Sequence, residues 1–424
     1  MQYLKRATKT PLSEDVREPV AKMLAELKAG GEDTARSYAK KFDGYEGSIL
    51  LGAEEIAAAA EQIPEELKRD IEFAYERVKR FAEAQRGCLH DLEYAEDGVT
   101  LGHRWIPVTN AGCYVPGGRY AHVASAIMSV STAKVAGVKN IVACTPGKGL
   151  EGVNPAVLYT LDLCGADHIL ALGGVQGVAA LAYGQFTGHK ADILVGPGNI
   201  YVAEAKRLLY GSVGIDVFAG PSEVAVIADE SADPELVAVD LVAQAEHGPT
   251  SPAWLFTTSS DLGKKVAARM PELIAELPAT AQAASSQAWE DYGEIILCDS
   301  FEDIVAVSDR YAPEHLEVHA HHPRRYLDAL TSYGSLFLGE EAPVAYGDKV
   351  SGPNHILPTR YAANYSSGLN VSKFMKTLTY QQMTPEASVK LGAVTARICR
   401  AEGMEGHARS ADIRLERYAK LQKV

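Results

Sequence analysis

The spacing of apolar side chains divides the chain into two kinds of sequence. Residues 18–42 and 70–83 carry apolar side chains at helical spacing, and the pair Gly30–Gly31 interrupts the first of these stretches. We therefore interpret the first hundred residues as helical scaffold without chemistry of its own. From about residue 105, short apolar runs alternate with glycine-rich turns and helix-like stretches, which is typical of an α/β protein with parallel sheets.

The apolar runs predict buried strands, and the stretches between them predict helices. The strands are expected within residues 140–147, 168–174, 191–199, 223–229, 253–259, 294–298 and 335–339, and the helices within 124–138, 154–166, 178–184, 201–211 and 235–248. Ligands of parallel sheets gather at the carboxyl ends of the strands. The loops expected at such ends are 112–122, 173–177, 196–199 and 219–223.

The length of 424 residues exceeds what one hydrophobic core usually organises, so several folded parts are expected. The pattern predicts an N-terminal helical segment (1–20), a discontinuous first α/β domain (21–110 and 229–370), a second α/β domain (111–228) and a helical C-terminal tail (371–424). In the tail, Thr384–Pro385 suits an N-cap followed by the first residue of a helix.

Composition narrows the possible partners. A formal net charge of -14 argues against nucleic acid, because a phosphate backbone needs clustered Lys and Arg, but it is compatible with a local basic pocket for an anionic small molecule. The six cysteines show no C-x-x-C spacing, so we expect reduced thiols and a cytoplasmic protein. We see no apolar secretion signal and no apolar run of about 20 residues that would cross a membrane.

A first group of candidate residues lies at the end of a predicted helix. Gln244 and His247 stand three residues apart and therefore share a helix face. His247 comes just before Gly248–Pro249, where an imidazole can either bind a metal or cap the helix dipole. The segment alone leaves both interpretations open.

The adjacent pair Glu314 and His315 forms a second group. Such a pair can divide acid and base duties, with one residue activating water or an alcohol and the other relaying the proton. A solvated turn is the alternative. The crowded histidines His319, His321 and His322 are interpreted as part of a wet loop and not as a metal site.

Two later loops add further candidates. Asp348 and His355 lie seven residues apart across a Ser-Gly-Pro turn, and loops of this kind carry function more often than packing. Glu402 and His407 lie between two predicted tail helices, where a capped turn is the alternative. No segment matches a P-loop or a strict G-x-G-x-x-G fingerprint, although residues 173–177 follow a strand and open a helix, where a pyrophosphate could bind.

Taken together, these segments resemble the histidinol dehydrogenases, and the resemblance extends nearly from end to end. It is carried by CYVPGG, AKVAGV, ALGGVQ, VGPGN, AGPSEV, AQAEHGP, APEHL, GDKVSGPNHILPT and AEGMEGH, in this order. It implies two incomplete Rossmann-like α/β domains with parallel sheets and helical terminal segments. It also implies a homodimer with shared active sites, in which the C-terminal tail crosses to the partner.

The resemblance implies roles for individual residues. Zinc would be bound by Gln244, His247, Asp348 and His407, and the acid–base pair would be Glu314 and His315. The substrate would be contacted by Ser222, His355 and Glu402. NAD would be held by Tyr114, Gln176 and Asn199. The implied reaction is a two-step oxidation of a primary alcohol to a carboxylate with two NAD. In it, His315 takes the alcohol proton and Glu314 activates water for the second step.

The chain departs from the common family pattern where it adds positive charge near the implied pocket. Arg119 and His122 follow the YVPGG segment, and Lys373 replaces a small or acidic residue. Histidinol is a cation, so these residues favour an anionic alcohol instead. The variant stretches resemble a subgroup that oxidises (R)-2,3-dihydroxypropane-1-sulfonate to (R)-3-sulfolactate. We expect these three residues to hold the sulfonate; for Arg119, contact with the NAD pyrophosphate is the alternative.

Two other functions stay open at this point. One is the oxidation of L-histidinol to L-histidine. The other is a zinc-bearing binding protein that has lost catalysis, although the intact pair Glu314–His315 speaks against it.

Overall fold

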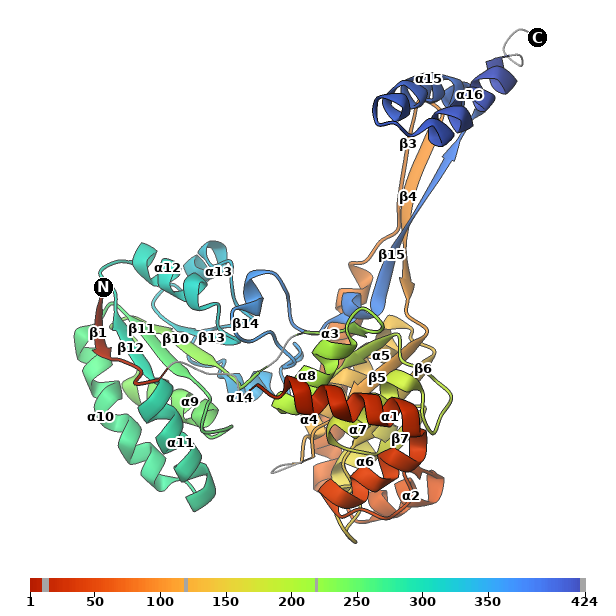
Figure 1. The fold of residues 1–424 in the computed structure, drawn as a ribbon. Helices are drawn as coiled ribbons and strands as arrows, with labels where there is room; N and C mark the ends of the chain where they lie inside the picture. Colours follow the sequence, from red (N-terminus) through yellow and green to blue (C-terminus); the bar gives the residue numbers. More distant parts are fainter. Residues whose placement is uncertain (10–14, 118–120, 218–219, 420–424) are drawn as a thin grey trace. The chain divides into compact units, whose positions relative to one another are not determined.

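The computed structural model describes residues 1–9, 15–117, 121–217 and 220–419. They form two compact units, one of residues 1–86 and 108–374 and the other of residues 87–107 and 375–424 (Figure 1). The first unit holds two six-stranded sheets, which we call sheet A and sheet B, and the second holds a sheet of three strands. The expected α/β class with parallel sheets is confirmed.

Sheet A has the strand order β1-β12-β11-β10-β13-β14. Its strands are β1 (Gln2–Lys5), β10 (Val224–Ala228), β11 (Ala253–Thr257), β12 (Glu294–Leu297), β13 (His315–His319) and β14 (Ser335–Leu338). Only β1 runs antiparallel to its neighbour, β12. The strand order reverses at β10, which lies between β11 and β13.

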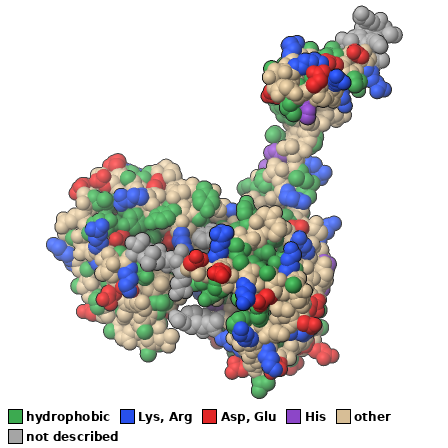
Figure 2. Space-filling view, viewed as in Figure 1, with side chains coloured by type: hydrophobic (Ala, Val, Ile, Leu, Met, Phe, Trp, Pro, Cys, Tyr) green, Lys and Arg blue, Asp and Glu red, His purple; other side chains and the backbone are tan. Residues whose placement is uncertain are grey.

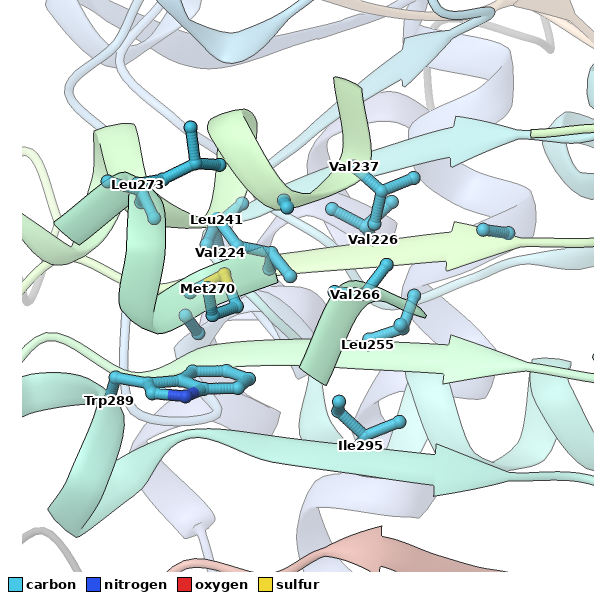
Figure 3. Packing of buried hydrophobic residues seen from close by; sticks show 14 of the residues in the cluster. Val224, Val226, Val237, Leu241, Leu255, Val266, Met270, Leu273, Trp289 and Ile295 are labelled. Carbon is cyan, nitrogen blue, oxygen red and sulfur yellow. The ribbon is translucent and has the colours of Figure 1, made fainter. Parts of the chain in front are cut away.

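Helices cover both faces of sheet A, which explains why most of its strands are continuous apolar runs. Helices α9 (Pro234–Ala245), α10 (Ser260–Glu276) and α11 (Ala279–Tyr292) pack on one face, and α12 (Phe301–Tyr311) and α13 (Pro323–Ala329) pack on the other. Figure 3 shows the first of these cores, where Leu241 of α9 lies near Val226 and Leu255 of the sheet. The core holds α9 firmly against the strands that carry the site described below.

Sheet B repeats this arrangement with the order β2-β7-β6-β5-β8-β9. Its strands are β2 (Leu50–Leu51), β5 (Asn110–Tyr114), β6 (Asn140–Thr145), β7 (His168–Ala171), β8 (Ile193–Val195) and β9 (Gly214–Ile215), and β2 alone is antiparallel to its neighbour. The connecting helices are α4 (Val123–Ala126), which continues through η2 (Ile127–Ser131) into α5 (Thr132–Ala136), and α6 (Pro155–Leu163), α7 (Gly174–Tyr183) and α8 (Ile200–Leu209).

The early helices pack with sheet B. Helix α1 (Arg17–Tyr38) lies against α7 and α8, α2 (Ala53–Glu61) lies against α6, and β2 pairs with β7. This differs from the grouping of residues 21–110 with 229–370 that the sequence suggested. The reason is that helical spacing reveals an apolar face but not which sheet that face covers.

The second unit contains strands where helices or no regular structure were expected. Strands β3 (Leu92–Glu96), β4 (Val99–Pro107) and β15 (Met375–Met383) form an antiparallel sheet, followed by α15 (Pro385–Ala401) and α16 (Glu405–Ala419). Likewise, β1 occupies part of the segment 1–20 that was predicted to be helical. The strands of the second unit are mostly exposed, so they lack the apolar runs that marked the strands of the first unit. Thr384 caps α15 as predicted, accepting a hydrogen bond from the Ala387 N–H at 3.2 Å.

Three structural observations bear on the expectations drawn from composition. None of the described helices is long and apolar enough to span a membrane. The buried cysteines are thiols, as expected; they are Cys113, Cys144, Cys164, Cys298 and Cys399. On the face shown in Figure 2, acidic and basic side chains are interspersed.

A buried ion pair fixes the loop after β8. Lys206 of α8 pairs with Asp216, which follows β9, and both side chains are buried. Lys206 Nζ also donates to the carbonyl oxygen of Gly196 at 2.9 Å, and Asp216 accepts from the Gly196 N–H at 2.7 Å. Gly196 has a φ of +117°, and a Cβ there would lie 1.9 Å from the carbonyl oxygen of Tyr114, so the position requires glycine.

Asp216→Asn should lower the free energy of unfolding by about 3–5 kcal/mol, because it leaves the buried Lys206 ammonium without its counter-charge. The exposed pair Lys265–Asp261 of α10 provides the control. Asp261→Asn should cost less than about 1 kcal/mol, because water already screens that pair. Urea unfolding followed by circular dichroism measures both values, and equal losses would contradict the role given to the buried pair.

Candidate functional site

The acid–base candidates Glu314 and His315 are buried at the amino end of β13, beside the start of β10. Glu314 Oε2 accepts a hydrogen bond from the Glu223 N–H at 2.9 Å, and the His315 N–H donates to the Glu223 carbonyl oxygen at 3.2 Å. Parallel pairing sets Val224 opposite His315. The pair therefore belongs to a strand register and not to a solvated turn. It also lies at the amino ends of the strands, whereas the fold class favoured the carboxyl ends.

The ring of His315 is held in one orientation. Its Nδ1 lies 3.1 Å from the carbonyl oxygen of Glu223, which can only accept, so Nδ1 carries the proton in the neutral ring. Nε2 lies 3.3 Å from Asp348 Oδ1 and is without a hydrogen-bond partner among the described residues. The nitrogen that faces Asp348 is therefore the one that can take a proton from a substrate.

Burial and neighbouring charges shift the pKa values of this group. Burial raises the pKa of Glu314, and it raises that of Glu223 to about 8. Desolvation lowers the pKa of His315, but Glu314 and Asp348 together raise it well above its ordinary value. Burial acts to raise the pKa of Asp348, but the surrounding imidazoles, His315 first, hold it well below its usual range. Asp348 is therefore a carboxylate at neutral pH.

The loop from Asp348 to His355 connects this group to sheet B. His355 Nδ1 donates to the carbonyl oxygen of Asp348 at 3.0 Å, and its Nε2 lies 2.9 Å from Ser125 Oγ of α4. Asn354 Nδ2 donates to the Met128 carbonyl oxygen at 2.8 Å. With Nδ1 donating, Nε2 must accept from the Ser125 hydroxyl, so His355 is a neutral, fixed ring. Desolvation is the main cause that lowers its pKa.

Three of the four predicted metal ligands belong to the first unit. Gln244 is buried in α9, and its Nε2 is without a hydrogen-bond partner in the described part of the chain. His247 follows the last turn of α9 and keeps access to solvent; desolvation lowers its pKa, while Asp348 acts to raise it. A side-chain amide can be turned to present its oxygen. Oxygen, imidazole nitrogen and carboxylate donors suit Zn²⁺, so these residues fit the ion.

The fourth predicted ligand lies in the second unit. His407 is exposed in the first turn of α16, and Glu402 is exposed at the C-cap of α15. The two residues are separate from the first unit. Their roles as zinc ligand and substrate contact therefore stay predictions.

The predicted NAD residues gather around one cavity of about 520 Å³. Tyr114, Gln176 and Asn199 all line it, at the carboxyl ends of β5, β7 and β8. The order of sheet B reverses between β5 and β8, which is where doubly wound sheets bind nucleotides. Asn199 also caps α8, accepting from the Tyr201 N–H at 3.0 Å.

The first turn of α7 forms one wall of this cavity. The Gly174 N–H donates to Tyr114 Oη at 3.1 Å, and Gln176 Nε2 donates to Asp43 Oδ2 at 3.1 Å. A helix N-terminus attracts phosphate, so the cavity can hold a dinucleotide without a G-x-G-x-x-G fingerprint. Asp43 comes from the early helical region, which we interpreted from its pattern as scaffold without chemistry.

The residues predicted to hold a sulfonate do not all lie in one place. His122 lines the NAD cavity, and its pKa is lowered to about 4 by desolvation and then by the charges of His355 and Lys349. Lys373 Nζ donates to Ser366 Oγ at 3.1 Å. Burial is the main cause that lowers the pKa of Lys373.

Two predicted substrate residues have fewer structural observations. Ser222 is half-buried directly before Glu223, whose backbone hydrogen-bonds the side chains of the acid–base pair. Arg119 lies outside the described residues, so its role stays a prediction.

Besides Asp43, sequence reasoning missed Glu223 and Lys349. Glu223 is buried, its Oε1 accepts from the Arg360 N–H at 2.9 Å, and its Oε2 is without a partner among the described residues. Its signal was an acidic residue next to a fully apolar strand. Lys349 is exposed beside Asp348, and its charge lowers the pKa of three histidines of the site.

The interpretation of His319 as part of a wet loop is wrong. His319 is the buried last residue of β13, whereas His321 and His322 are exposed. The alternation of HLEVH suggests a strand with one wet face. In the structure, the polar face packs beneath α9, and the distant helix that covers it cannot be recognised from the local pattern.

Comparisons with known proteins show which family the whole chain resembles. The family model for histidinol dehydrogenase matches residues 6–415. The chain is 55% identical to the sulfopropanediol 3-dehydrogenase of Ruegeria pomeroyi over 421 residues, which cover 99% of this chain and 97% of that protein. It is 54% identical to a histidinol dehydrogenase homolog of Pelagibacter ubique over 420 residues, which cover 98% of each.

A crystal structure supports the same relationship. The histidinol dehydrogenase of Elizabethkingia anophelis superposes with a TM-score of 0.91 at 35% identity, and the match covers 96% of this chain and 94% of that one. The match extends over nearly the whole of both chains, so it includes both sheets of the first unit. The chain therefore belongs to the histidinol dehydrogenase family of NAD-dependent alcohol dehydrogenases.

Proposed function

We propose that this protein oxidises (R)-2,3-dihydroxypropane-1-sulfonate to (R)-3-sulfolactate with two NAD and one zinc ion. The name of the Ruegeria pomeroyi relative, sulfopropanediol 3-dehydrogenase, supports this substrate class. The structural observation that carries the proposal is Lys349, a cation beside Asp348 and the histidines of the site.

Lys349 suits an anionic substrate. It is exposed, and no ion pair or hydrogen bond of its side chain is found in the described part of the chain. A sulfonate stays ionised and offers three acceptor oxygens, so it can pair with this ammonium. L-Histidinol carries a positive amine, which the same ammonium repels. His122 is the second residue proposed to contact the sulfonate, and Arg119 is the third.

The first oxidation follows from the orientation of His315. Zn²⁺ bound by Gln244, His247 and Asp348, with His407 of a second copy, would supply a Lewis acid that makes the substrate hydroxyl more acidic. In the neutral ring, His315 Nε2 takes the hydroxyl proton, while Nδ1 keeps its hydrogen bond to the Glu223 carbonyl. The carbon gives its hydride to NAD, and an aldehyde forms.

The second oxidation uses Glu314. Its buried carboxylate takes a proton from the water that adds to the aldehyde, and the hydrate gives a second hydride to a second NAD. The overall change consumes the alcohol, one water and two NAD⁺, and it yields the carboxylate, two NADH and three protons. The intact acid–base pair supports an active enzyme over a binding protein that has lost catalysis.

A homodimer completes the proposal. Helix α15 exposes Leu391, Val394 and Ile398, which lie three and four residues apart and so form one apolar stripe. An exposed apolar stripe of this kind suits contact with another protein surface. We assign this surface to a second copy, so that Glu402 and His407 reach the partner's site.

Substrate choice is tested with purified protein, NAD and each alcohol. The (R)-sulfonate should give two NADH for each alcohol consumed, and L-histidinol should give little or none. His315→Ala should lower kcat by about 10²–10⁴-fold, because the base is lost, and His321→Ala on the exposed turn should not. Turnover of L-histidinol without the sulfonate would establish the histidinol activity instead. Zinc binding without turnover of either alcohol would favour a binding protein.

Lys349→Met should raise KM for the sulfonate by about tenfold or more, because a charge-assisted contact of about 1.5–3 kcal/mol is lost. KM for NAD should stay unchanged. Lys349→Arg keeps the charge and should restore most of the affinity. Steady-state kinetics measures all three proteins, and a Lys349→Met enzyme with an unchanged sulfonate KM would refute this contact.

Complementation between subunits tests the crossed tail. His247→Ala and His407→Ala should each lose zinc and activity as homodimers. In a heterodimer of the two variants, a crossed tail gives one site both histidines and the other site neither. Purified heterodimers should therefore bind about half of the wild-type zinc and regain about half of its activity. Restoration of neither property would show that each subunit builds its site alone.

A further inference from the structure

We propose that Asp240, Glu317 and His319 form a second site for a divalent transition metal. One ligand atom of each residue lies within 4.8 Å of the others, and they are the sole such group of three His, Cys, Asp or Glu found among the described residues. The group differs from the zinc ligands proposed above in every member. It also stands apart from the acid–base pair in function, because the reaction uses none of its residues.

The strand and the helix bring the three residues together. Side chains alternate along a strand, so His315, Glu317 and His319 share the face of β13 that α9 covers. Asp240 lies on α9, four residues before Gln244 and therefore on the same side of that helix. Helix α9 thus carries members of two candidate ligand groups, Asp240 in one and Gln244 in the other.

Glu317 and His319 bury polar atoms that are without hydrogen-bond partners in the described part of the chain. The His319 side chain has an exposed fraction of 0%, and both ring nitrogens are without a hydrogen-bond partner in the described chain. Glu317 Oε2 is likewise without a partner, while Glu317 Oε1 accepts from the Val344 N–H at 2.5 Å. A buried polar atom left unpaired costs about 1–3 kcal/mol. A bound ligand would remove part of this cost, because Glu317 Oε2 and the two ring nitrogens of His319 lie together.

The spacing suits a metal better than a direct contact. His319 Nε2 lies 3.9 Å from Asp240 Oδ2 and 3.7 Å from Glu317 Oε2, too far for hydrogen bonds. Two tetrahedral ligands that each lie about 2.1 Å from zinc are about 3.4 Å apart. A small contraction would therefore place all three atoms on one ion.

A proton shared by Asp240 and Glu317 would not satisfy all the unpaired atoms of this group. Burial, followed by the charge of Asp240, raises the pKa of Glu317 to about 8, and burial raises the pKa of Asp240 to about 6. One proton between the carboxyl groups would relieve their repulsion. It would still leave the imidazole of His319 without a partner, whereas a cation satisfies all three residues.

The ligand chemistry points to Zn²⁺ or Mn²⁺. An imidazole with two carboxylates suits divalent transition metals, whereas Ca²⁺ and Mg²⁺ prefer oxygen ligands alone. Asp240 keeps an exposed side-chain fraction of 14%, which gives an ion a path to the group and leaves room for water as a fourth ligand. On the strand side of the group, Glu317 and His319 are buried from solvent.

Such an ion would act on the structure of the catalytic site. Glu317 holds the N–H of Val344 at the start of α14 (Val344–Gly347), and the Val344 carbonyl oxygen accepts from the Asp348 N–H at 2.8 Å. The ion would therefore join α9, β13 and the short helix that ends at Asp348. It would position that carboxylate without touching the substrate.

Metal counting on the full-length protein tests this site. Each protein is stripped with a chelator, reloaded with Zn²⁺, dialysed and analysed by plasma mass spectrometry. Wild type should hold two Zn²⁺ per chain, and His247→Ala and His319→Ala should hold one each. His321→Ala, on the exposed turn nearby, should hold two. An unchanged count in His319→Ala, or one ion in wild type and none in His247→Ala, would overturn the proposal.

A diffraction measurement covers the case in which His319→Ala fails to fold. Wild-type crystals soaked in Zn²⁺ should show an anomalous peak within about 2.0–2.2 Å of the ligand atoms of His319 and Glu317. Absence of a peak there, with a peak at Gln244 and His247, would refute the second site. Neither measurement uses turnover, so its outcome is independent of the proposed substrate.

Discussion

The pairing of β10 with β13 sets the geometry on which the site depends. It places the backbone of Glu223 against both Glu314 and His315, so one peptide segment orients the carboxylate and fixes the tautomer of the imidazole. A slip of one residue would turn His315 toward the opposite core and bring an apolar side chain in its place. The apolar residues Leu316 and Val318 resist this slip, because they are buried among the side chains beneath α12 and α13.

The same register forces β13 to bury polar side chains under α9. His315 lies beside Asp348 and the Glu223 carbonyl oxygen. Glu317 and His319, in contrast, have polar atoms without hydrogen-bond partners among the described residues. Such a surface is stable only when its polar atoms are satisfied by something else. The second metal proposed at Asp240, Glu317 and His319 would answer this requirement.

Much of the first unit could be predicted from the sequence because its strands are covered on both faces. The run Val224–Ala228 is wholly apolar, and Ala253–Thr257 is apolar up to its last residue, so their pattern alone identifies them. Strand β13 was not predicted, because its polar side chains contact α9, about 75 residues earlier in the chain. Strands β4 and β15 were not predicted either, because they pair with each other across more than 260 residues and are largely exposed.

The candidate site could be predicted only in part. Resemblance selected Gln244, which local chemistry alone would not choose, and the structure shows its amide buried and unpaired. The acidic residue beside an apolar strand was the one local sign of Glu223, whose backbone orients the acid–base pair. Local pattern could not indicate Asp43, which reaches the NAD cavity from another element. Glu402 and His407 belong to a separate unit, so the fold of the first unit does not test their contribution, which stays a prediction.

Lys349 differs from the acid–base pair in what its replacement would cost. It is exposed, and its neighbours in the loop do not need its side chain for packing, whereas Glu314 and His315 are buried in a strand register. Replacement of this exposed charge, which we propose meets the substrate, should therefore carry little penalty in stability and leave the acid–base pair unchanged. A family built in this way can diversify its substrates faster than its chemistry, and a laboratory can redirect such an enzyme from the same position.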